Sequence, residues 1–457
     1  RTMRSYVFCL HRYMRFYIYL FWFAGLSIHS HAQTPFASKQ IPELESLPDR
    51  TQELQRLIDE SEGNLILKAG IYRISASLCF PLQQKQSTII RAPHGPVTLV
   101  MDGPGPALKI TGSHEGTASP KTFDYPTWNE RMPMIEGIEI IGNHPKADGI
   151  ALVRCVQPSI TRVAIRWCRH GIRLVERNRN VVISDCHLYE NSGAGLYLDD
   201  VNLHQINVSN SHISYNRAGG IVVKDGNVRN LHITGCDLEG NMPADDTPTA
   251  AANILLDVSG FPNDKTRSIA EVAITGCTIQ HSSNYSGPSY ESLAPGGANI
   301  RIFGKEIWPI DSVTITGNVI SDTSVLIDIN TATDIAINGN TFFAPNPDFL
   351  HATNCKRLNL GGNTFNPRQF NRPGRLVFKE CEASIISNCT FHALGEENGA
   401  ISLSRCNNMI LSDNIISQGK SGLLIEKSKN ITVRNWSVSG IPEGELIRQD
   451  SESIVNR

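Results

Sequence analysis

Ionisable side chains recur at matching positions of short alternating segments in the middle of the chain. Each segment has two apolar residues one apart, as in Leu196-Tyr197-Leu198-Asp199, and a charged residue lies between or after them. Because alternate residues of an extended strand point to opposite sides, the apolar pair would face a core and the charge would face solvent. The outward residues we take as candidate catalytic groups are, in chain order, Asp199, Lys224, Asp257, Arg301, Asp328 and His351. The apolar pairs that align them are Ile150/Leu152, Ile172/Leu174, Leu196/Leu198, Ile221/Val223, Ile254/Leu256, Ile300/Ile302, Ile327/Ile329 and Leu350/Ala352.

Cations beside groups that take up a proton suit β-elimination on a uronate sugar. That reaction requires the sugar carboxylate to be neutralised and the neighbouring proton to be removed. Arg173 or Arg301 could supply the positive charge. Lys224, His351 or Tyr197 could act as the base, provided that its pKa is tuned towards the working pH.

The carboxylates of the series suit two other tasks. Glycoside hydrolysis uses two carboxyl groups, about 5–5.5 Å apart for retention and about 6.5–9.5 Å for inversion. Asp199, Asp257 and Asp328 occur in every second segment, so segments stacked about 4.8 Å apart would separate neighbours in this series by about 9.6 Å. Asp199 and Asp257 could instead hold Ca²⁺ as the neutralising charge. The sequence has no His/Cys metal spacing, and Ca²⁺ is the cofactor left open.

One phrase repeats from residue 135 onward and sets the spacing of these segments. It consists of an apolar residue, two small or polar residues, Cys or Asn, one further residue and an apolar residue, as in Ile233-Thr-Gly-Cys236 and Ile315-Thr-Gly-Asn318. Degenerate copies place Ile138, Val163, Ser211 and Trp436 at the Cys/Asn position, and nine of the eleven intervals between successive copies are 22–26 residues long, while the other two are 41. Short alternating strands recur within this period without a helical pattern between them, which indicates a β-solenoid.

The repeat predicts an all-β, right-handed parallel β-helix of about a dozen coils, with a short N-terminal capping helix. A leucine-rich repeat would need a fixed file of leucines, which the sequence lacks. Asn318, Asn340 and Asn363 would lie on consecutive coils and hydrogen-bond along the axis. The cysteines are expected to be small buried hydrophobes, because Cβ atoms of parallel neighbours about 4.8 Å apart are farther apart than the roughly 3.8 Å of a disulfide.

The two 41-residue intervals mark enlarged loops beside Asp257 and Arg301. Both loops that flank this strand are lengthened there, as the walls of a groove would be. Tyr285, Tyr290 and Trp308 lie in or beside these insertions, and aromatic rings next to charges suit a sugar chain. We take these three aromatic residues, with Arg173 and Tyr197, as candidate substrate-binding residues.

Net charge and the N-terminal sequence limit the binding partners and the cellular compartment that we expect for this protein. The formal charge is −2, and residues 1–32 contain four arginines and no acid, which leaves 38 basic and 44 acidic residues. A mildly acidic protein has no global attraction for nucleic acid or anionic membranes. Phe16 to Ile28 is an apolar run behind Arg15 and is followed by Ser30-His31-Ala32, which predicts a signal peptide cleaved after Ala32. We expect Met3 or Met14 as the true start, and a secreted or periplasmic protein without a membrane anchor after cleavage.

Residues 49–74 resemble the entry of the pectate-lyase-like superfamily. The resemblance rests on "LQRLID" (Leu54–Asp59) and on "LKAGIYRI" (Leu67–Ile74) as the first strand pair. It implies a β-helix over roughly residues 45–450 whose N-terminal helix covers the open end, and a substrate groove along the strand that follows the variable loop. The superfamily includes lyases, hydrolases, epimerases and non-catalytic phage spikes, so it specifies fold more than function. The signatures of its polygalacturonases, pectate lyases and alginate epimerases are absent or out of order.

These observations predict how the chain is divided into parts, and they predict one function together with one alternative function. The predicted parts are a signal peptide (1–32), a linker (33–48), a cap helix and first coils (49–110), a loop insertion (111–134) and β-helix repeats (135–457) with insertions at 237–252, 258–268 and 278–298. The predicted function is cleavage of an acidic, uronate-containing polysaccharide by β-elimination or hydrolysis. The alternative is a non-catalytic glycan-binding or cell-surface β-helix.

Overall fold

The computed structural model describes residues 41, 43–61, 63–84, 88–117, 119–122, 125–245, 247–282, 294–368, 374–394 and 399–456. The chain divides into two units, residues 1–34 and 35–457. The predicted signal peptide lies outside the described residues. Among the helices of the described part, none has the length and apolar character needed to span a membrane.

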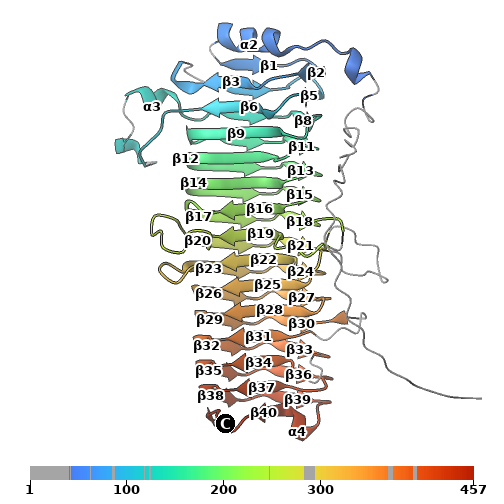
Figure 1. Ribbon diagram of the computed structural model, residues 1–457, viewed down its shortest axis with the longest axis vertical. Helices are drawn as coiled ribbons and strands as arrows, with labels where there is room; N and C mark the ends of the chain where they lie inside the picture. Colours follow the sequence, from blue (N-terminus) through green and yellow to red (C-terminus); the bar gives the residue numbers. More distant parts are fainter. Residues whose placement is uncertain are drawn as a thin grey trace, which may run out of the picture. The chain divides into compact units, whose positions relative to one another are not determined.

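Three short strands joined at corners form each turn of the second unit. In one turn these are β16 (Gly219–Lys224), β17 (Asn227–Thr234) and β18 (Asp237–Glu239). Each pairs in parallel with the equivalent strand one turn before and one turn after, such as β19 (Ala252–Asp257) for β16. The strands therefore stack into three faces, and the solenoid is a parallel β-helix as predicted (Figure 1).

Each face is one column of stacked strands. Face 1 contains β3 (Leu78–Pro81), β6 (Gly105–Thr111), β9 (Ala147–Val156), β12 (Ile172–Ser184), β14 (Ala194–Ser209), β16, β19, β22 (Ala298–Phe303), β25 (Val325–Asn330), β28 (Asp348–Thr353), β31 (Leu376–Lys379), β34 (Ile401–Ser404), β37 (Leu423–Glu426) and β40 (Ile447–Gln449). Face 2 contains β1 (Asn64–Ile66), β4 (Ile89–Arg91), β7 (Met134–Glu136), β10 (Ser159–Thr161), the second halves of β12 and β14, β17, β20 (Ser268–Thr275), β23 (Ile310–Thr316), β26 (Ala332–Asn338), β29 (Lys356–Gly361), β32 (Glu382–Ser387), β35 (Asn407–Ser412), β38 (Lys429–Arg434) and β41 (Val455–Asn456). Face 3 contains β2 (Gly70–Ile74), β5 (Val97–Met101), β8 (Glu139–Gly142), β11 (Ala164–Arg166), β13 (His187–Tyr189), β15 (His212–Ser214), β18, β21 (Thr278–Gln280), β24 (Val319–Ser321), β27 (Thr341–Phe343), β30 (Thr364–Asn366), β33 (Thr390–His392), β36 (Ile415–Ser417) and β39 (Ser437–Ser439).

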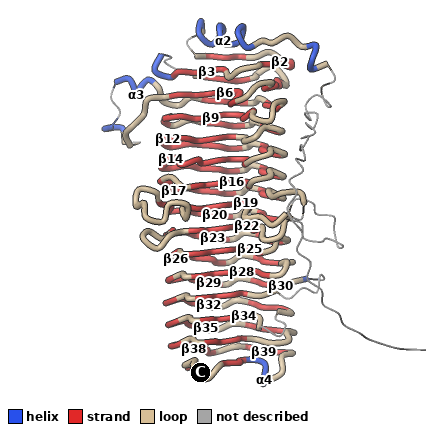
Figure 2. The backbone as a smooth tube through the Cα atoms, in the orientation of Figure 1, coloured by secondary structure: helices blue, strands red, loops and turns tan. Residues whose placement is uncertain are grey.

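Helices are few and lie outside the stack of strands (Figure 2). The described ones are α2 (Thr51–Glu60), α3 (Tyr125–Asn129) and α4 (Glu443–Leu446), with 3-10 turns η1 (Leu44–Ser46), η2 (Leu82–Gln84) and η3 (Pro120–Thr122). Helix α2 is the predicted cap. It buries Leu54 and Ile58 against β1 and β3 and covers the first strand edges, which would otherwise be open to pairing with another chain.

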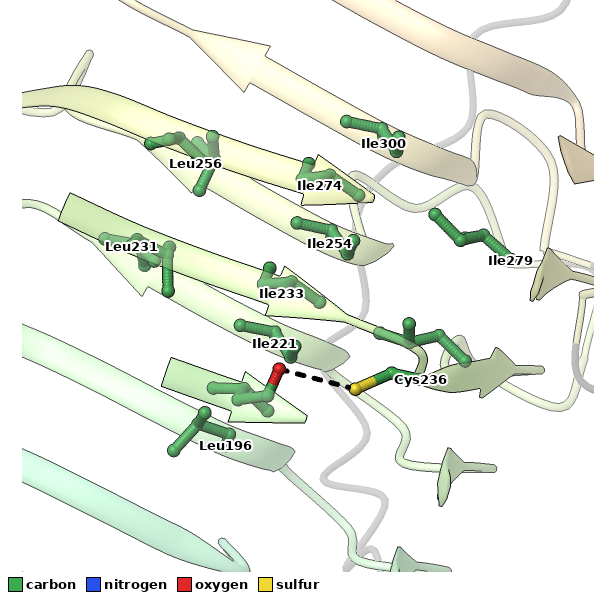
Figure 3. Packing of buried hydrophobic residues seen from close by; sticks show 14 of the residues in the cluster. Leu196, Ile221, Leu231, Ile233, Cys236, Ile254, Leu256, Ile274, Ile279 and Ile300 are labelled. Carbon is green, nitrogen blue, oxygen red and sulfur yellow. Dashed lines mark hydrogen bonds between the residues drawn. The ribbon is translucent and has the colours of Figure 1, made fainter. Parts of the chain in front are cut away.

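Apolar side chains fill the interior in files that run along the axis. Leu196, Ile221, Ile254 and Ile300 occupy one file on successive turns (Figure 3), and all four are fully buried. The register of face 1 matches all eight apolar pairs aligned from the sequence, from Ile150 to Leu350.

The repeated phrase marks a corner where the backbone turns left-handed. Gly235, Gly276 and Gly317 have φ between +61° and +68°. A Cβ at Gly276 or Gly317 would meet nothing within 4 Å, so glycine is needed there for its backbone freedom and not for space. Asn388 and Asp413 fill the same position with φ of +55° and +57°, which fits the tolerance of Asn and Asp for this conformation.

The asparagine that follows this corner forms the predicted ladder. Asn318 Nδ2 donates to Asn340 Oδ1 at 3.0 Å, and Asn340 Nδ2 donates to Asn363 Oδ1 at 3.1 Å. Each oxygen also accepts from a backbone amide, as Asn340 Oδ1 does from Asn318 N at 2.9 Å. All ten cysteines in the described residues are free, and nine are buried, as expected.

A second asparagine ladder was not predicted. It contains Asn191, Asn216, Asn241, Asn253 and Asn299, with Nδ2 to Oδ1 distances of 2.7–2.8 Å. Its first spacings are 25 residues, but Asn253 and Asn299 continue it from another position, near the starts of β19 and β22, with spacings of 12 and 46 residues, which hid the repeat.

Replacing one ladder asparagine should destabilise the solenoid. Asn340→Ala removes the side-chain partners of Asn318, Asn363 and the buried Ile315 carbonyl. We expect the free energy of unfolding to fall by about 1–3 kcal/mol for the buried groups left unpaired. Urea unfolding followed by circular dichroism measures it, with the exposed Asn359→Ala as the matched control. Equal midpoints for the two variants would contradict a stabilising ladder.

Candidate functional site

The structure places all six predicted catalytic residues on face 1, in two outward columns. In one column, Tyr197 is followed two turns later by Leu255 and then by Arg301, Asp328 and His351. In the other column, Asp199, Lys224 and Asp257 follow one another directly. The alternation in the sequence therefore gave both the face and the register.

The charges on face 1 pair with one another along the axis. Arg173 Nη2 lies 2.5 Å from Asp199 Oδ2, Lys224 Nζ lies 2.5 Å from Asp257 Oδ2, and Arg301 Nε lies 3.0 Å from Asp328 Oδ2. Opposite charges on neighbouring strands stabilise the pairing of the strands. A cation also separates Asp199 from Asp257, so these two carboxylates do not face each other as a hydrolytic pair would.

Two neighbouring turns, those of β12 and β14, contain an accessible cluster around Tyr197. The Arg173 and Asp199 side chains are 36% and 25% exposed. Burial, together with the charge and hydrogen bond of Asp199, raises the pKa of Tyr197 to about 12. Tyr197 therefore keeps its proton at physiological pH and presents it beside a carboxylate and a guanidinium.

His170 belongs to this cluster but was not predicted as a site residue. Its ring centroid lies 4.9 Å from that of Tyr197. Its Nδ1 accepts from the backbone amide of Ala194 at 3.1 Å, and burial lowers its pKa. A Cβ at Gly193 would lie 2.6 Å from the ring, so the imidazole is tightly packed. His170 thus fixes the wall behind Tyr197.

Arg301 has a structural task at its position. Its side chain is 6% exposed, and besides Asp328 it donates to the carbonyls of Gly296 (2.5 Å) and Ala251 (3.4 Å). These carbonyls belong to the two long connections that precede β22 and β19. Arg301 therefore holds the loops together, and its role in turnover stays a prediction.

His351 and Asp328 lie away from Tyr197. His351 is five turns from Tyr197 in the same column, about 24 Å at 4.8 Å per turn. Its Nε2 lies 2.8 Å from Asp348 Oδ2, and Arg375 binds the same carboxylate at 2.6 Å. The predicted residues are thus spread along face 1, from an upper cluster around Tyr197 through the Lys224–Asp257 and Arg301–Asp328 pairs to His351 beside Asp348. The two ends of this series cannot act on one sugar bond together.

The loop between β19 and β20 covers the corner between faces 1 and 2 next to the upper cluster. Arg267 binds Asp200 (Nη2 to Oδ2, 2.6 Å) and Asp264, and its guanidinium lies 4.1 Å from the ring centroid of Phe261. The buried Lys305 donates to the loop carbonyls of Phe261 and Asp264. These bonds hold the loop as a fixed wall.

Exposed aromatic rings lie on and beside this wall. Phe261 and Trp308 are each 43% exposed. Tyr285 and Tyr290, which were also predicted to bind substrate, lie outside the described residues.

Asp225 is a second site residue that the sequence did not reveal. It follows Lys224 at a left-handed corner (φ +59°). Burial, with the neighbouring charges of Asp257 and Asp200, raises its pKa, while Lys224 acts in the opposite direction. Its Oδ1 is buried without a hydrogen-bond partner. The only sequence signal was an aspartate at a corner, which also occurs for conformational reasons alone.

The described part of the chain contains no preformed site for the Ca²⁺ that the sequence left open. No group of three or more His, Cys, Asp or Glu side chains is arranged there to hold a metal ion. Asp257 Oδ1 accepts from the amide and hydroxyl of Ser259, and its Oδ2 is bound by Lys224. Asp199 is paired with Arg173.

Comparison with known families confirms the architecture. The model of the right-handed beta helix region matches residues 132–259 and 263–456. The chain belongs to this right-handed β-helix family. The narrower assignment to the pectate-lyase-like superfamily stays a prediction. No curated protein gives a significant match to the sequence.

Solved β-helix structures are similar to this chain at low identity. The tailspike protein of E. coli bacteriophage HK620, solved with a pentasaccharide, is 13% identical with a TM-score of 0.43, covering 89% of this chain and 77% of that one. Tailspike protein 3 of bacteriophage CBA120 is 11% identical with a TM-score of 0.45, covering 92% and 62%. The A-module of the Azotobacter vinelandii mannuronan C-5 epimerase AlgE4 is 12% identical with a TM-score of 0.34, covering 90% and 96%.

The raised pKa of Tyr197 predicts a specific dependence of stability on pH. The folded state holds the phenol proton up to about pH 12, whereas the unfolded chain releases it near pH 10. The contribution is complete below pH 10 and is lost as pH rises towards 12. Thermal unfolding between these pH values should therefore show a smaller loss of stability for Tyr197→Phe than for the wild type. If the stability of the wild type and of Tyr197→Phe fell equally over this pH range, the pKa of the Tyr197 phenol would not be raised.

Proposed function

We propose that this β-helix protein binds an acidic polysaccharide along the upper part of face 1 and cleaves it by β-elimination. The observation that carries the proposal is the Arg173–Asp199–Tyr197 cluster. It presents a guanidinium, a carboxylate and a protonated phenol on one partly exposed wall. Elimination on a uronate needs these three functions: a positive charge, a base and an acid.

Arg173 and Lys224 are the cations for the sugar carboxylates. The planar guanidinium of Arg173 binds a carboxylate through two parallel N–H groups, which neutralises the uronate and makes its C5 proton more acidic. Lys224 aligns with Asp199 on the next turn, so it would meet the carboxylate of a neighbouring sugar unit. The exposed rings of Phe261 and Trp308 offer apolar contact to sugar faces.

Asp199 and Tyr197 are the base and the acid. When Arg173 turns to the substrate carboxylate, Asp199 loses its counter-ion and becomes more basic. Asp199 then takes the C5 proton, the C4–O bond breaks, a C4–C5 double bond forms, and Tyr197 gives its proton to the leaving oxygen. The hydrogen bond between the phenol and the Asp199 carboxylate lets the proton return to Tyr197, which resets the site.

Asp225 supports hydrolysis as a second candidate. Its raised pKa suits a general acid, and Asp257 and Asp200 are the carboxylates whose charges it senses. Both are ion-paired, with Lys224 and Arg267, so the base of a hydrolytic pair would first have to be released.

The predicted export fits either chemistry, because an exported protein meets polysaccharides directly. We propose a secreted or periplasmic location on the basis of the N-terminal apolar run alone.

Product analysis with three variants tests the proposal. Purified protein is incubated with a panel of uronate polysaccharides, and the unsaturated product is followed by its ultraviolet absorbance. Tyr197→Phe and Asp199→Asn should each slow cleavage by about 100-fold or more, the usual effect of losing an acid or base. Arg173→Ala should lower kcat as well as raise KM, because Arg173 both binds the sugar carboxylate and makes the C5 proton more acidic. The exposed, ion-paired Arg405→Ala serves as the matched control and should leave cleavage unchanged.

Two other outcomes would overturn elimination. New reducing ends without the absorbance, lost in Asp225→Asn, would establish hydrolysis. Binding of the polysaccharide without either product would identify a non-catalytic glycan-binding protein.

A further inference from the structure

A groove separate from the site on face 1 runs along face 2, near the N-terminal end of the solenoid. Two hollows of about 700 and 400 Å³ share three lining residues, Asn180, Gln205 and Asn230. They lie over the second halves of β12 and β14 and over β17. The predicted insertion at 111–134 borders them through Thr117, Ser119 and Met132.

The floor of the groove is a column of carboxamides on four successive turns. Gln157, Asn180, Gln205 and Asn230 all have φ between +51° and +64° and hold the same position of each turn on face 2. Arg357 and Ala383 hold the same position lower in the solenoid, with φ of +55° and +52°, and amides recur further on at Asn408 and Asn430. The backbone conformation therefore admits an amide without requiring one, and what distinguishes the groove is the run of four amides on successive turns beside the two hollows.

A second column lies beside the amides, two residues further along each strand. The register aligns Ser159, Val182, Asn207 and His232 on the same four turns. Val182 is 38% exposed, and Met132 on the bordering insertion is 68% exposed. The groove therefore combines a polar strip with apolar patches.

Two acceptor atoms in the amide column are left unused. Gln157 Oε1 and Asn180 Oδ1 are buried and have no hydrogen-bond partner. A buried acceptor without a partner costs about 1–3 kcal/mol, and a ligand hydroxyl would recover this free energy once the amide turns its oxygen into the groove. The amide column therefore has hydrogen-bonding capacity that the described residues leave unused.

The described part of the bordering insertion is held to face 2 by hydrogen bonds. Arg177 Nη1 donates to the Gly116 carbonyl at 3.1 Å, which ties the insertion to face 2. Within it, the buried Glu130 accepts from the amide (2.6 Å) and the hydroxyl (2.5 Å) of Ser113. Pre-organised walls reduce the entropy lost on binding.

The charges around the groove select an uncharged ligand. Its lining residues include no Asp, Glu or Lys. The Arg179 guanidinium at its floor is 4% exposed and donates to the carbonyl and side chain of Asn202 at 2.8 Å. Neither a uronate nor a basic peptide would find a counter-charge here.

We infer that this groove binds a neutral polysaccharide chain laid along the solenoid axis. Amides offer donors and acceptors to sugar hydroxyls, and Val182 and Met132 offer contact to the apolar ring faces. The amides repeat about every 4.8 Å, close to the length of one sugar unit, whereas an extended peptide advances about 3.3 Å per residue and would fall out of step. The site is separate from face 1, and the inference does not depend on the proposed cleavage.

Calorimetric titration of the full chain with neutral hexasaccharides tests the inference. The probes are β-1,4-linked gluco-, manno-, xylo- and galacto-hexasaccharides. At least one should bind, with an affinity that added NaCl does not change, because no charge is involved. The double variant Asn180→Ala/Gln205→Ala should weaken this binding about ten-fold, the loss expected for two hydrogen bonds.

A matched variant controls for general effects. Asn359→Ala/Asn408→Ala removes two exposed carboxamides from the corresponding columns of face 2 outside the groove and should bind like the wild type. If Asn180→Ala disturbs folding, judged by the thermal midpoint, Gln205→Ala/Asn207→Ala replaces two exposed groove amides instead.

The inference would be overturned if none of the four hexasaccharides bound, if the groove and control variants bound alike, or if an extended peptide library bound in their place. Failure of the proposed cleavage is read separately, because a wild type that makes no product from uronates can still be titrated with neutral sugars.

Discussion

In-register parallel stacking is the constraint on which the structure depends. Because each turn repeats the path of the one before, every side chain has an equivalent neighbour about 4.8 Å above and below it. A file of apolar residues is stable under this rule, since each member packs on the next. The phenyl rings of Phe342, Phe365 and Phe391 show it, with centroids 4.8 and 5.1 Å apart and nearly parallel planes.

Polar residues must satisfy the same rule in other ways. A carboxamide has a donor and an acceptor, so asparagines can pair with copies of themselves, as in the two ladders. A charge cannot do so and needs the opposite sign on the next turn, which explains Arg173 above Asp199 and Lys224 above Asp257. The charged columns of face 1 are therefore part of the scaffold as well as candidates for chemistry. The Tyr197 cluster differs because it adds a phenol and an imidazole that the stacking does not require.

The fold and its register could be predicted from the sequence because both follow from local periodicity. The alternation of apolar and polar residues along each strand predicted the inward-facing pairs from Ile150 to Leu350. The interval between successive Gly-Asn or Gly-Cys corners predicted the number of residues in a turn. What could not be predicted depends on side-chain direction and on non-repeating segments. The sequence placed Arg301 on the correct strand but could not show that its guanidinium turns towards loop carbonyls. His170 lies at a corner outside the alternation, so nothing connected it with Tyr197. The groove on face 2 depends on where residues 111–134 cross the strands, which no repeat determines.

The second asparagine ladder continues past both long insertions, since Asn241, Asn253 and Asn299 remain bonded although 12 and 46 residues separate them. The scaffold is therefore indifferent to how much chain leaves and re-enters between two rungs. Segments at these points can be exchanged during evolution, or grafted by design, while the core keeps its geometry. New specificities can therefore be acquired in this fold by replacing the loops between strands, without rebuilding the strands themselves.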